Sequence, residues 1–524
     1  MNLRSIGFGF GLALLALATP CSARDVIIGR VSEQAAIDPH FNNAGNDYST
    51  MKNIYEGLIA YDLRQQMVPA LAESWSMSDP LTWNVKLRQG VKFHNSNELT
   101  ADDVAFSLDR ATHVPNSPSS FVRQLGDIAS ISVTGRYTLT IVTKYPAPLM
   151  FELAGQVYIL NRAASEGATT SDYNSGKAAI GTGPYRFVSW ARGDNTKFAR
   201  FDEYWGGKPE FENVTVRFIT NPAARVAALL TGAVDVADGI PAADIAGLQS
   251  NPAVTISSAP TSRVVFLELD SARDQSPFVT DPDGKPLDRN PLRDRRVRIA
   301  LSKLINRTAI VDRVLLGGGV AAGQLVPEGQ GGYDAALIPI PFDPEGALKL
   351  LAEAGYPNGF GLVIHGPNDR FPQDAALAQA LAQMLTRGRI KVREVVTMPF
   401  NIYIGQATDQ KFSAFIFAYN GPAANAADPL RSTLMTRDLS KGNGGVNRGR
   451  YSNAQFDEVL QQALGTFDEA KRNRLMAEAT KIGMEDGGLL PIYWQRSFWG
   501  ARKGFTYEAN GLDESSARFA HAAP

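Results

Sequence analysis

Residues 55–110 read YEGLIAYDLRQQMVPALAESWSMSDPLTWNVKLRQGVKFHNSNELTADDVAFSLDR, and this stretch decides the fold. Its segment TWNVKLRQGVKFH (82–94) is predicted to form a strand. Its last segment, LTADDVAFSLDR, predicts a helix, because Thr100 can cap the first turn while Asp102 and Asp103 lie near the positive end of the helix dipole. The stretch therefore predicts a strand followed by a helix.

Strand-like and helix-like patterns alternate on both sides of this stretch. Alternating apolar residues predict strands at 24–31, 137–144 and 212–219. A helix should follow the third strand, with Asn221 as its cap and Gly232 near its end. Further helices are predicted at 293–315, 343–355, 374–388 and 452–464. The Pro- and Asp-rich segment 271–291 and the Gly-rich segment 442–449 are predicted loops. This alternation indicates a mixed α/β protein.

The N-terminus has the pattern of a cleavable signal peptide. Arg4 gives a short basic start, residues 6–17 are apolar, and the sequence Cys21-Ser22-Ala23 places small residues where signal peptidase cleaves. The apolar run is shorter than the roughly 20 residues that span a bilayer. We expect residues 1–23 to be removed and the mature protein to work in the periplasm.

Charge and cysteine content exclude several classes of function. Removing residues 1–23 takes away one of 52 basic residues and none of 53 acidic residues, so 51 and 53 remain and the net charge is −2. This balance gives no reason to expect a nucleic acid as partner. The chain's one cysteine lies in the predicted leader, which excludes disulfides and thiolate metal sites from the mature protein. A mature chain of this length should divide into at least two lobes.

The sequence shows no catalytic motif. The five histidines form no H-x-x-x-H pair, and neither a G-x-S-x-G elbow nor a G-x-x-x-x-G-K-[ST] loop is present. The glycines of segment 442–449 fit no nucleotide-binding fingerprint. We therefore predict no catalytic residue, no cofactor and no metal ligand.

The 55–110 stretch resembles the signature block of the extracellular solute-binding proteins, family 5, which serve peptide, nickel and opine importers. Its order of PALAESW, a predicted strand and LTADDVAFSL is long and specific. Other blocks resemble the family in the same order, and the resemblance covers essentially the whole mature chain. They include IDPH (37–40), GTGPYRF (181–187), LRDRRVRIALSKLINRTAI (292–310), DPEGALKLLAEAGYPNGF (343–360) and LLPIYWQ (489–495).

This resemblance implies a periplasmic-binding-protein-like fold with two hinged lobes. Lobe I would comprise residues 24–60, 180–270 and 484–524, with residues 61–179 as an extra subdomain. Lobe II would comprise residues 271–483. The two crossings between the lobes would act as the hinge.

The resemblance also implies a function. The protein would capture a di- or oligopeptide, or a modified peptide such as glutathione, between its lobes. It would act as a monomer and deliver the solute to the permease subunits of an ABC importer, which cytoplasmic ATPase subunits drive. An opine, an oligosaccharide or a chelated metal are alternative ligands within the same role. A periplasmic hydrolase is the alternative from another class, but it lacks a visible nucleophile and base.

The family's binding pattern points to candidate ligand contacts. Arg370 lies where similar proteins place an arginine that binds the carboxylate of the ligand, which suits a guanidinium fork. Dipeptide binders carry an aspartate soon after a Gly-Trp pair, whereas this chain has Tyr419 and Asn420 there, and its first acid is Asp428. Either Asp428 takes the amine-binding role, or the ligand has no simple free amine.

Other candidates come from loops and strand ends that the family places at the cleft. Buried aromatic residues are more often packing than recognition, so core packing is the competing interpretation for the two aromatic candidates. These further candidates are Ser32, Glu33, Gln34, Asn447, Arg448, Tyr493 and Trp494.

Overall fold

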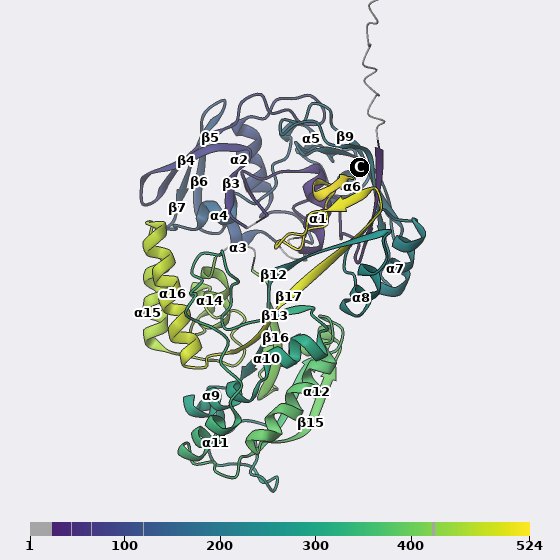
Figure 1. Ribbon diagram of the computed structural model, residues 1–524. Helices are drawn as coiled ribbons and strands as arrows, with labels where there is room; N and C mark the ends of the chain where they lie inside the picture. The colour runs from purple at the N-terminus through teal and green to yellow at the C-terminus, as the bar shows by residue number, and fades with distance from the viewer. Residues whose placement is uncertain (1–23, 43–44, 64, 119, 422–424, 524) are drawn as a thin grey trace, which may run out of the picture.

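The computed structural model describes residues 24–42, 45–63, 65–118, 120–421 and 425–523. The predicted signal peptide, residues 1–23, lies outside the described residues. Figure 1 shows a large upper part that holds the C-terminus and a lower part that carries α9, α11 and α12. Two long strands, β12 (Val254–Leu269) and β17 (Leu490–Arg502), run between these parts.

The two parts share one sheet, which has 11 strands in the described residues. On one side of the β12–β17 pair lie β11 (Val236–Ala237), β1 (Arg24–Arg30), β10 (Phe211–Phe218), β9 (Asn195–Arg200) and β8 (Tyr185–Ala191). On the other side lie β16 (Ala414–Tyr419), β14 (Gly361–Pro367) and β15 (Lys391–Met398), and β13 (Gly319–Ala321) pairs with β17. The first set belongs to the first lobe and the second set to the second lobe.

The pairing of β12 with β17 is interrupted where the sheet passes between the lobes. The strands pair from Val254–Arg502 to Pro260–Arg496, and pairing resumes at Val264–Trp494. Residues 261–263 are therefore out of register. An extra residue in a strand bends the strand and increases its twist.

The first lobe confirms the predicted strand-helix-strand unit. β1 pairs in parallel with both β10 and β11, and α7 (Pro222–Thr231) connects β10 to β11. The Asn221 side chain accepts a hydrogen bond from the N–H of Ala224 at 2.9 Å. Gly232 ends the helix with φ of +75°, a left-handed conformation that glycine adopts without strain.

The segment predicted to form the extra subdomain, residues 61–179, packs a four-stranded sheet against short helices. Its strands, in spatial order, are β4 (Ala72–Asp79), β5 (Thr82–Leu87), β7 (Thr138–Thr143) and β6 (Ile128–Gly135). The helix predicted after Thr100 is confirmed as α2 (Ala101–Arg110). The strand predicted for residues 82–94 was too long, because the chain turns at Gly90, where φ is +74°. The other elements before β8 are α1 (Gly45–Ile54), β2 (Ile59–Tyr61), β3 (Met67–Pro69), α3 (Val122–Leu125), α4 (Met150–Ala154), α5 (Arg162–Ser165) and α6 (Thr170–Asn174).

Helices cover both faces of the second-lobe sheet. Alternate residues of β12 point to opposite faces: Val265 joins one apolar core and Val264 another. The first core is covered by α9 (Arg295–Leu304), α11 (Pro344–Glu353) and α12 (Asp374–Leu385). The second is covered by α13 (Phe400–Thr408), α14 (Ala427–Thr433), α15 (Ala454–Leu464) and α16 (Glu469–Glu485). This arrangement confirms the predicted α/β class.

The single helix predicted for residues 293–315 is wrong. Helix α9 ends because Ile305 is extended, and α10 (Arg307–Ala309) begins after Asn306, whose side chain accepts a hydrogen bond from the N–H of Ala309. The predicted helices at 343–355, 374–388 and 452–464 are confirmed as α11, α12 and α15. The sequence interpretation did not name α16, the helix that follows α15.

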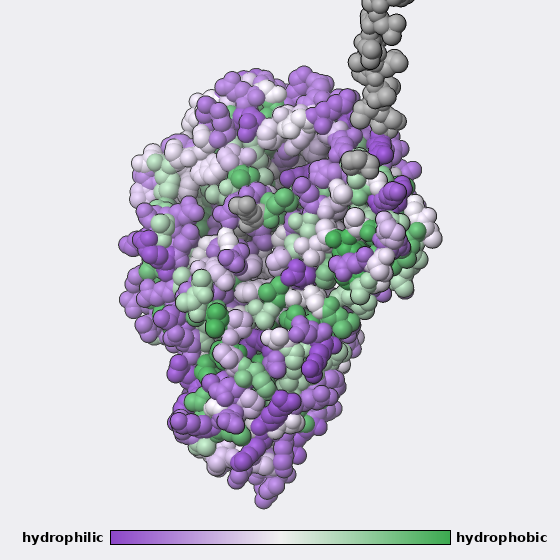
Figure 2. Space-filling model, in the orientation of Figure 1, coloured by the Kyte–Doolittle hydropathy of each residue, from purple (hydrophilic) through white to green (hydrophobic). Residues whose placement is uncertain are grey.

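The outer surface differs between regions. On the face that Figure 2 shows, polar residues cover most of the lower end of the second lobe, while apolar residues gather on the right, over α7 and α8 (Ile245–Gln249). Leu230 of α7 is 49% exposed. No helix of the described residues has the length and apolar character required to cross a membrane.

Candidate functional site

The candidate site lies at the edge of the second-lobe sheet that faces the first lobe. The parallel strands β14 and β16 both end at this edge, and they lead to Arg370 and Asn420. The register places Val264 opposite Tyr419 on one side and opposite Trp494 on the other. Strand ends of an α/β sheet are where ligands usually bind. The sheet thus brings Arg370, Tyr419, Asn420 and Trp494 to one edge.

Arg370 lies on the loop between β14 and α12. Its guanidinium carbon is 4.7 Å from the centroid of the Phe400 ring, and its backbone N–H donates to Asp374 at 2.9 Å. Partial burial of the guanidinium lowers the pKa of Arg370. The positive charge of Arg263 lowers this pKa further, and the negative charge of Asp369 opposes the decrease. The predicted carboxylate contact is therefore a partly buried cation on which both a positive and a negative side chain act.

Tyr419 and Asp428 are brought together. The Tyr419 hydroxyl donates to the Asp428 carboxylate at 2.6 Å and contacts the Ser432 hydroxyl at 3.2 Å. Asp428 lies in the first turn of α14. Asn420 is exposed beside this pair. An amine that approached Asp428 would meet a carboxylate whose orientation Tyr419 already fixes.

Tyr493 and Trp494 are buried on β17, with exposed fractions of 1% and 8%. Neither the Tyr493 hydroxyl nor the Trp494 indole Nε1 has a hydrogen-bond partner. Burial raises the pKa of Tyr493. Two further buried atoms also lack a hydrogen-bond partner, Nε of Arg263 and Oε1 of Gln495. The sequence analysis identified neither residue. Only one feature of the sequence could have identified Arg263 as a site residue: it is a polar residue directly before the apolar run VVFLEL.

Residues 32–34 are anchored within the first lobe. Glu33 accepts hydrogen bonds from the indole Nε1 of Trp190 at 2.6 Å and from the N–H of Gly193 at 3.0 Å. Gln34 is buried and donates to the Thr196 hydroxyl at 2.9 Å, and Ser32 is half-buried. The structure therefore does not group these residues with Arg370.

Asn447 organises its own loop in the second lobe. Its Nδ2 donates to the carbonyls of Met435 at 3.0 Å and Tyr451 at 2.8 Å, and its Oδ1 accepts from the N–H of Tyr451 at 3.0 Å. Arg448 lies over the Phe417 ring at 4.2 Å and donates to the Thr408 hydroxyl. Both side chains are occupied by contacts within the second lobe.

The extra subdomain touches the second lobe close to the candidate site. The Gln65 side-chain oxygen accepts hydrogen bonds from the Ser262 hydroxyl and from Nε2 of Gln330, each at 2.6 Å. The amide of Asn425 donates to both carboxylate oxygens of Glu152 at 2.8 Å. The two lobes therefore meet through side-chain hydrogen bonds, one of which joins an amide to the carboxylate of Glu152.

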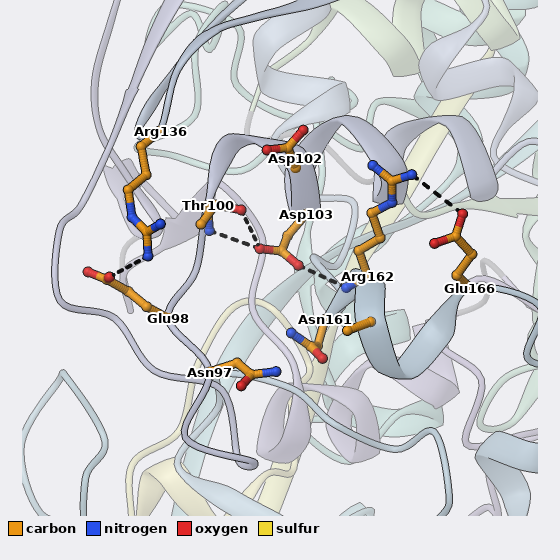
Figure 3. Close-up of a pocket in the computed structure, with 10 residues that line it drawn as sticks. Asn97, Glu98, Thr100, Asp102, Asp103, Arg136, Asn161, Arg162 and Glu166 are labelled. Atoms are coloured by element: carbon orange, nitrogen blue, oxygen red, sulfur yellow. Dashed lines mark hydrogen bonds and ion pairs between the residues drawn. The ribbon is translucent and has the colours of Figure 1, made fainter.

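A separate pocket of about 450 Å³ lies on the extra subdomain (Figure 3). Most of its charged side chains serve one another or the backbone: Glu98 pairs with Arg136 at 2.9 Å, and Asp103 accepts from the N–H groups of Thr100 and Arg162. None of the predicted ligand contacts lines this pocket. Over the residues that the structure describes, no group of three or more His, Cys, Asp and Glu side chains could hold a metal ion.

The family model for bacterial extracellular solute-binding proteins, family 5 Middle, matches residues 66–440. This chain belongs to that family. A family 5 chain is a solute-binding protein, and the strand-end site between two lobes is where such a solute can be enclosed.

Among family 5 relatives, the chain is similar to the glutathione-binding protein GsiB of Escherichia coli K12. The identity is 28% over 496 residues, which cover 93% of this chain and 92% of that protein.

Two solved structures share the fold over nearly the whole chain. HbpA2 from Haemophilus parasuis has a TM-score of 0.82 at 22% identity, covering 96% of this chain and all of that one. The periplasmic binding protein DppA from Helicobacter pylori, in complex with the peptide STSA, has a TM-score of 0.73 at 22% identity, covering 95% and 98%. These similarities support the fold of the two-lobed periplasmic binding proteins.

Proposed function

We propose that this protein captures a peptide or peptide-like solute between its lobes in the periplasm and delivers it to the permease of an ABC importer. The observation that carries this proposal is the position of Arg370 at the edge where the sheet strands end. Among the described residues Arg370 has no ion-pair partner. It lies near buried hydrogen-bonding groups that also lack partners. A ligand carboxylate would satisfy such a cation. The similarity to GsiB and to the peptide-bound DppA supports a peptide-like ligand.

Lobe closure would enclose the solute. We propose that the hinge lies where β12 and β17 lose register, at residues 261–263 and near Gln495, because an irregular pairing absorbs rotation more easily than a continuous ladder. The lobe limits predicted at 271 and 483, and the extra subdomain at 61–179, remain predictions. Enclosure removes water and strengthens each hydrogen bond to the ligand.

The remaining parts of the proposal follow from this role. The protein acts as a monomer that binds without chemical reaction, after export directed by residues 1–23. Its partners are the permease subunits of the importer, which cytoplasmic ATPase subunits energise. Contacts with those subunits would be transient and polar.

A thermal-shift screen tests this function. Protein comprising residues 24–524 is heated with di- to pentapeptides, glutathione, opines and oligosaccharides. A ligand at about 100 times its dissociation constant should add about 2.7 kcal/mol of stability and raise the melting temperature. Arg370→Ala should abolish the shift caused by the peptide-like ligand, whereas Arg387→Ala, at the exposed far end of α12, should retain it.

The outcomes separate the ligand classes. Shifts produced only by oligosaccharides or opines would contradict the peptide assignment and leave the solute-binding role in place. A peptide shift that survives in Arg370→Ala would remove Arg370 from the site.

A further inference from the structure

The second lobe has a cavity of about 670 Å³ that none of the predicted ligand contacts lines. Its wall comes from three segments: residues within 273–278 after β12, His365 of β14, and residues within 406–412, which lead from α13 to β16. Phe412 lies just before β16 begins, whereas Tyr419 ends this strand at the candidate site. A strand rises about 3.3 Å per residue, so the cavity and the candidate site lie at opposite ends of β16.

The imidazole of His365 contacts two aromatic rings in this wall. The Phe412 ring stacks on it with the centroids 4.2 Å apart, and the Phe278 centroid is 5.0 Å away. His365 is 3% exposed, and its Nδ1 is buried without a hydrogen-bond partner. Across the ranges that the structure describes, its Nε2 forms no hydrogen bond either. Burial lowers the pKa of His365 to about 4, so at neutral pH the imidazole is uncharged and has one donor and one acceptor unused.

Two residues of the cavity wall have a strained backbone. Phe278 has a φ of +61° and Gln410 has a φ of +56°, both in the left-handed region. This conformation is an outlier for a bulky residue such as Phe278, and strain of this kind clusters at functional sites. The Phe278 side chain is also 48% exposed, so that a ligand can reach its ring.

The charges of the cavity wall balance one another. Nε of Arg273 pairs with the Asp270 carboxylate at 2.7 Å, and its two other nitrogens donate to backbone carbonyls at 2.7 and 2.8 Å. Arg273 therefore fixes the wall and has no nitrogen left for a ligand. The two remaining charges, on Asp409 and Lys411, are exposed and opposite in sign. This balance favours a ligand without net charge.

We propose that this cavity is a second binding site, which takes a small uncharged aromatic compound with an N–H or O–H group on its ring. The ligand ring would contact Phe278, and its N–H or O–H would donate to the acceptor nitrogen of His365. A cavity of this volume, with mostly apolar walls and few polar groups, is typical of sites for small molecules. The inference goes beyond the proposed function, since the site lies apart from the edge proposed to hold the peptide-like solute.

NMR titration of protein comprising residues 24–524 with a matched pair of probes tests the inference. Indole carries a ring N–H, and 1-methylindole replaces that hydrogen with a methyl group. The wild type should bind indole roughly 5- to 10-fold more tightly, because only indole can donate to His365. His365→Phe keeps an aromatic ring and removes both nitrogens, so this variant should bind the two probes equally.

A second variant removes the exposed ring. Phe278→Asn introduces a residue that tolerates the left-handed backbone, and it should weaken the binding of both probes roughly 3- to 10-fold. Leu439→Ala is the matched control, because it truncates another exposed apolar side chain of the second lobe that does not line the cavity. It should bind both probes like the wild type.

The melting temperature without ligand distinguishes binding from packing. His365→Phe should melt at the temperature of the wild type or above it, because the variant keeps the ring and loses a buried polar atom that has no partner. A fall of several degrees would make the imidazole nitrogens structural and overturn the inference.

Four binding results would also overturn it. They are no binding of either probe, equal binding of indole and 1-methylindole to the wild type, unchanged indole binding in Phe278→Asn, and tighter binding of indole-3-acetate than of indole. The last result would show that the site prefers an anion. None of these results affects the peptide capture that the thermal-shift screen tests.

Discussion

Glu268 is a carboxyl group buried inside the second lobe, on β12. One of its oxygens accepts a hydrogen bond from the N–H of Gly449 at 2.6 Å, and the other has no partner. Burial raises the pKa of Glu268 to about 7, and the hydrogen bond from Gly449 offsets only part of this rise. The folded protein thus binds this proton more tightly than the unfolded chain does.

This carboxyl should make stability depend on pH. Its stabilising contribution is present below about pH 4.5 and is lost as the pH rises through about 7. Between pH 5 and pH 8 the wild type should lose about 2 kcal/mol of unfolding free energy relative to Glu268→Gln, which does not titrate. Urea unfolding at the two pH values measures this difference.

The control for this prediction is Glu394→Gln, which changes an exposed glutamate on the edge strand β15. Its stability should follow the wild type at both pH values. A constant difference between Glu268→Gln and the wild type from pH 5 to pH 8 would mean that Glu268 is not the titrating group.

At the scale of elements, the stability of α7 depends on the residues at its ends. The apolar pattern of this helix does not define where it starts, whereas the Asn221 side chain satisfies a backbone N–H that would otherwise lack a partner. Asn221→Ala should lower the unfolding free energy by about 1 kcal/mol, measured by urea unfolding. Asn420→Ala, which changes an exposed residue outside any helix, should leave stability unchanged and serves as control. An unchanged midpoint in Asn221→Ala would show that α7 needs no cap.

Elements also explain where the sequence interpretation failed. The helix predicted for residues 293–315 rested on the helical spacing of apolar residues from Val297 to Ile305, yet α9 stops at Leu304. Asn306 can cap a new helix, and its side chain competes with continuation of the old one. Spacing of apolar residues does not detect such competition.

At the scale of the whole molecule, the contact of the extra subdomain with the second lobe should control how far the lobes open. Gln65 is the acceptor that joins Ser262 and Gln330. Gln65→Ala should enlarge the radius of gyration of the ligand-free protein in small-angle X-ray scattering. Ligand affinity should fall roughly fivefold, because the binding-competent closed state is less populated.

Gln249→Ala, at the exposed end of α8 in the first lobe, is the matched control and should change neither quantity. If Gln65→Ala lowers affinity without any change in the radius of gyration, Gln65 contacts the ligand and does not act through lobe closure.

The sequence by itself determined the family, the α/β class and the helices whose ends carry capping residues. Asn221, Gly232 and Asp343 occupy the predicted helix ends. These features are local, because a cap or a glycine turn acts within a few residues of the chain.

Only the tertiary structure decided which side chains meet. It tied Glu33 to Trp190 and used Asn447 to hold a loop. It also set the pairing of β12 with β16 and β17, which joins segments more than a hundred residues apart. Residue pattern alone does not set that register, since it results from packing both faces of the sheet at once.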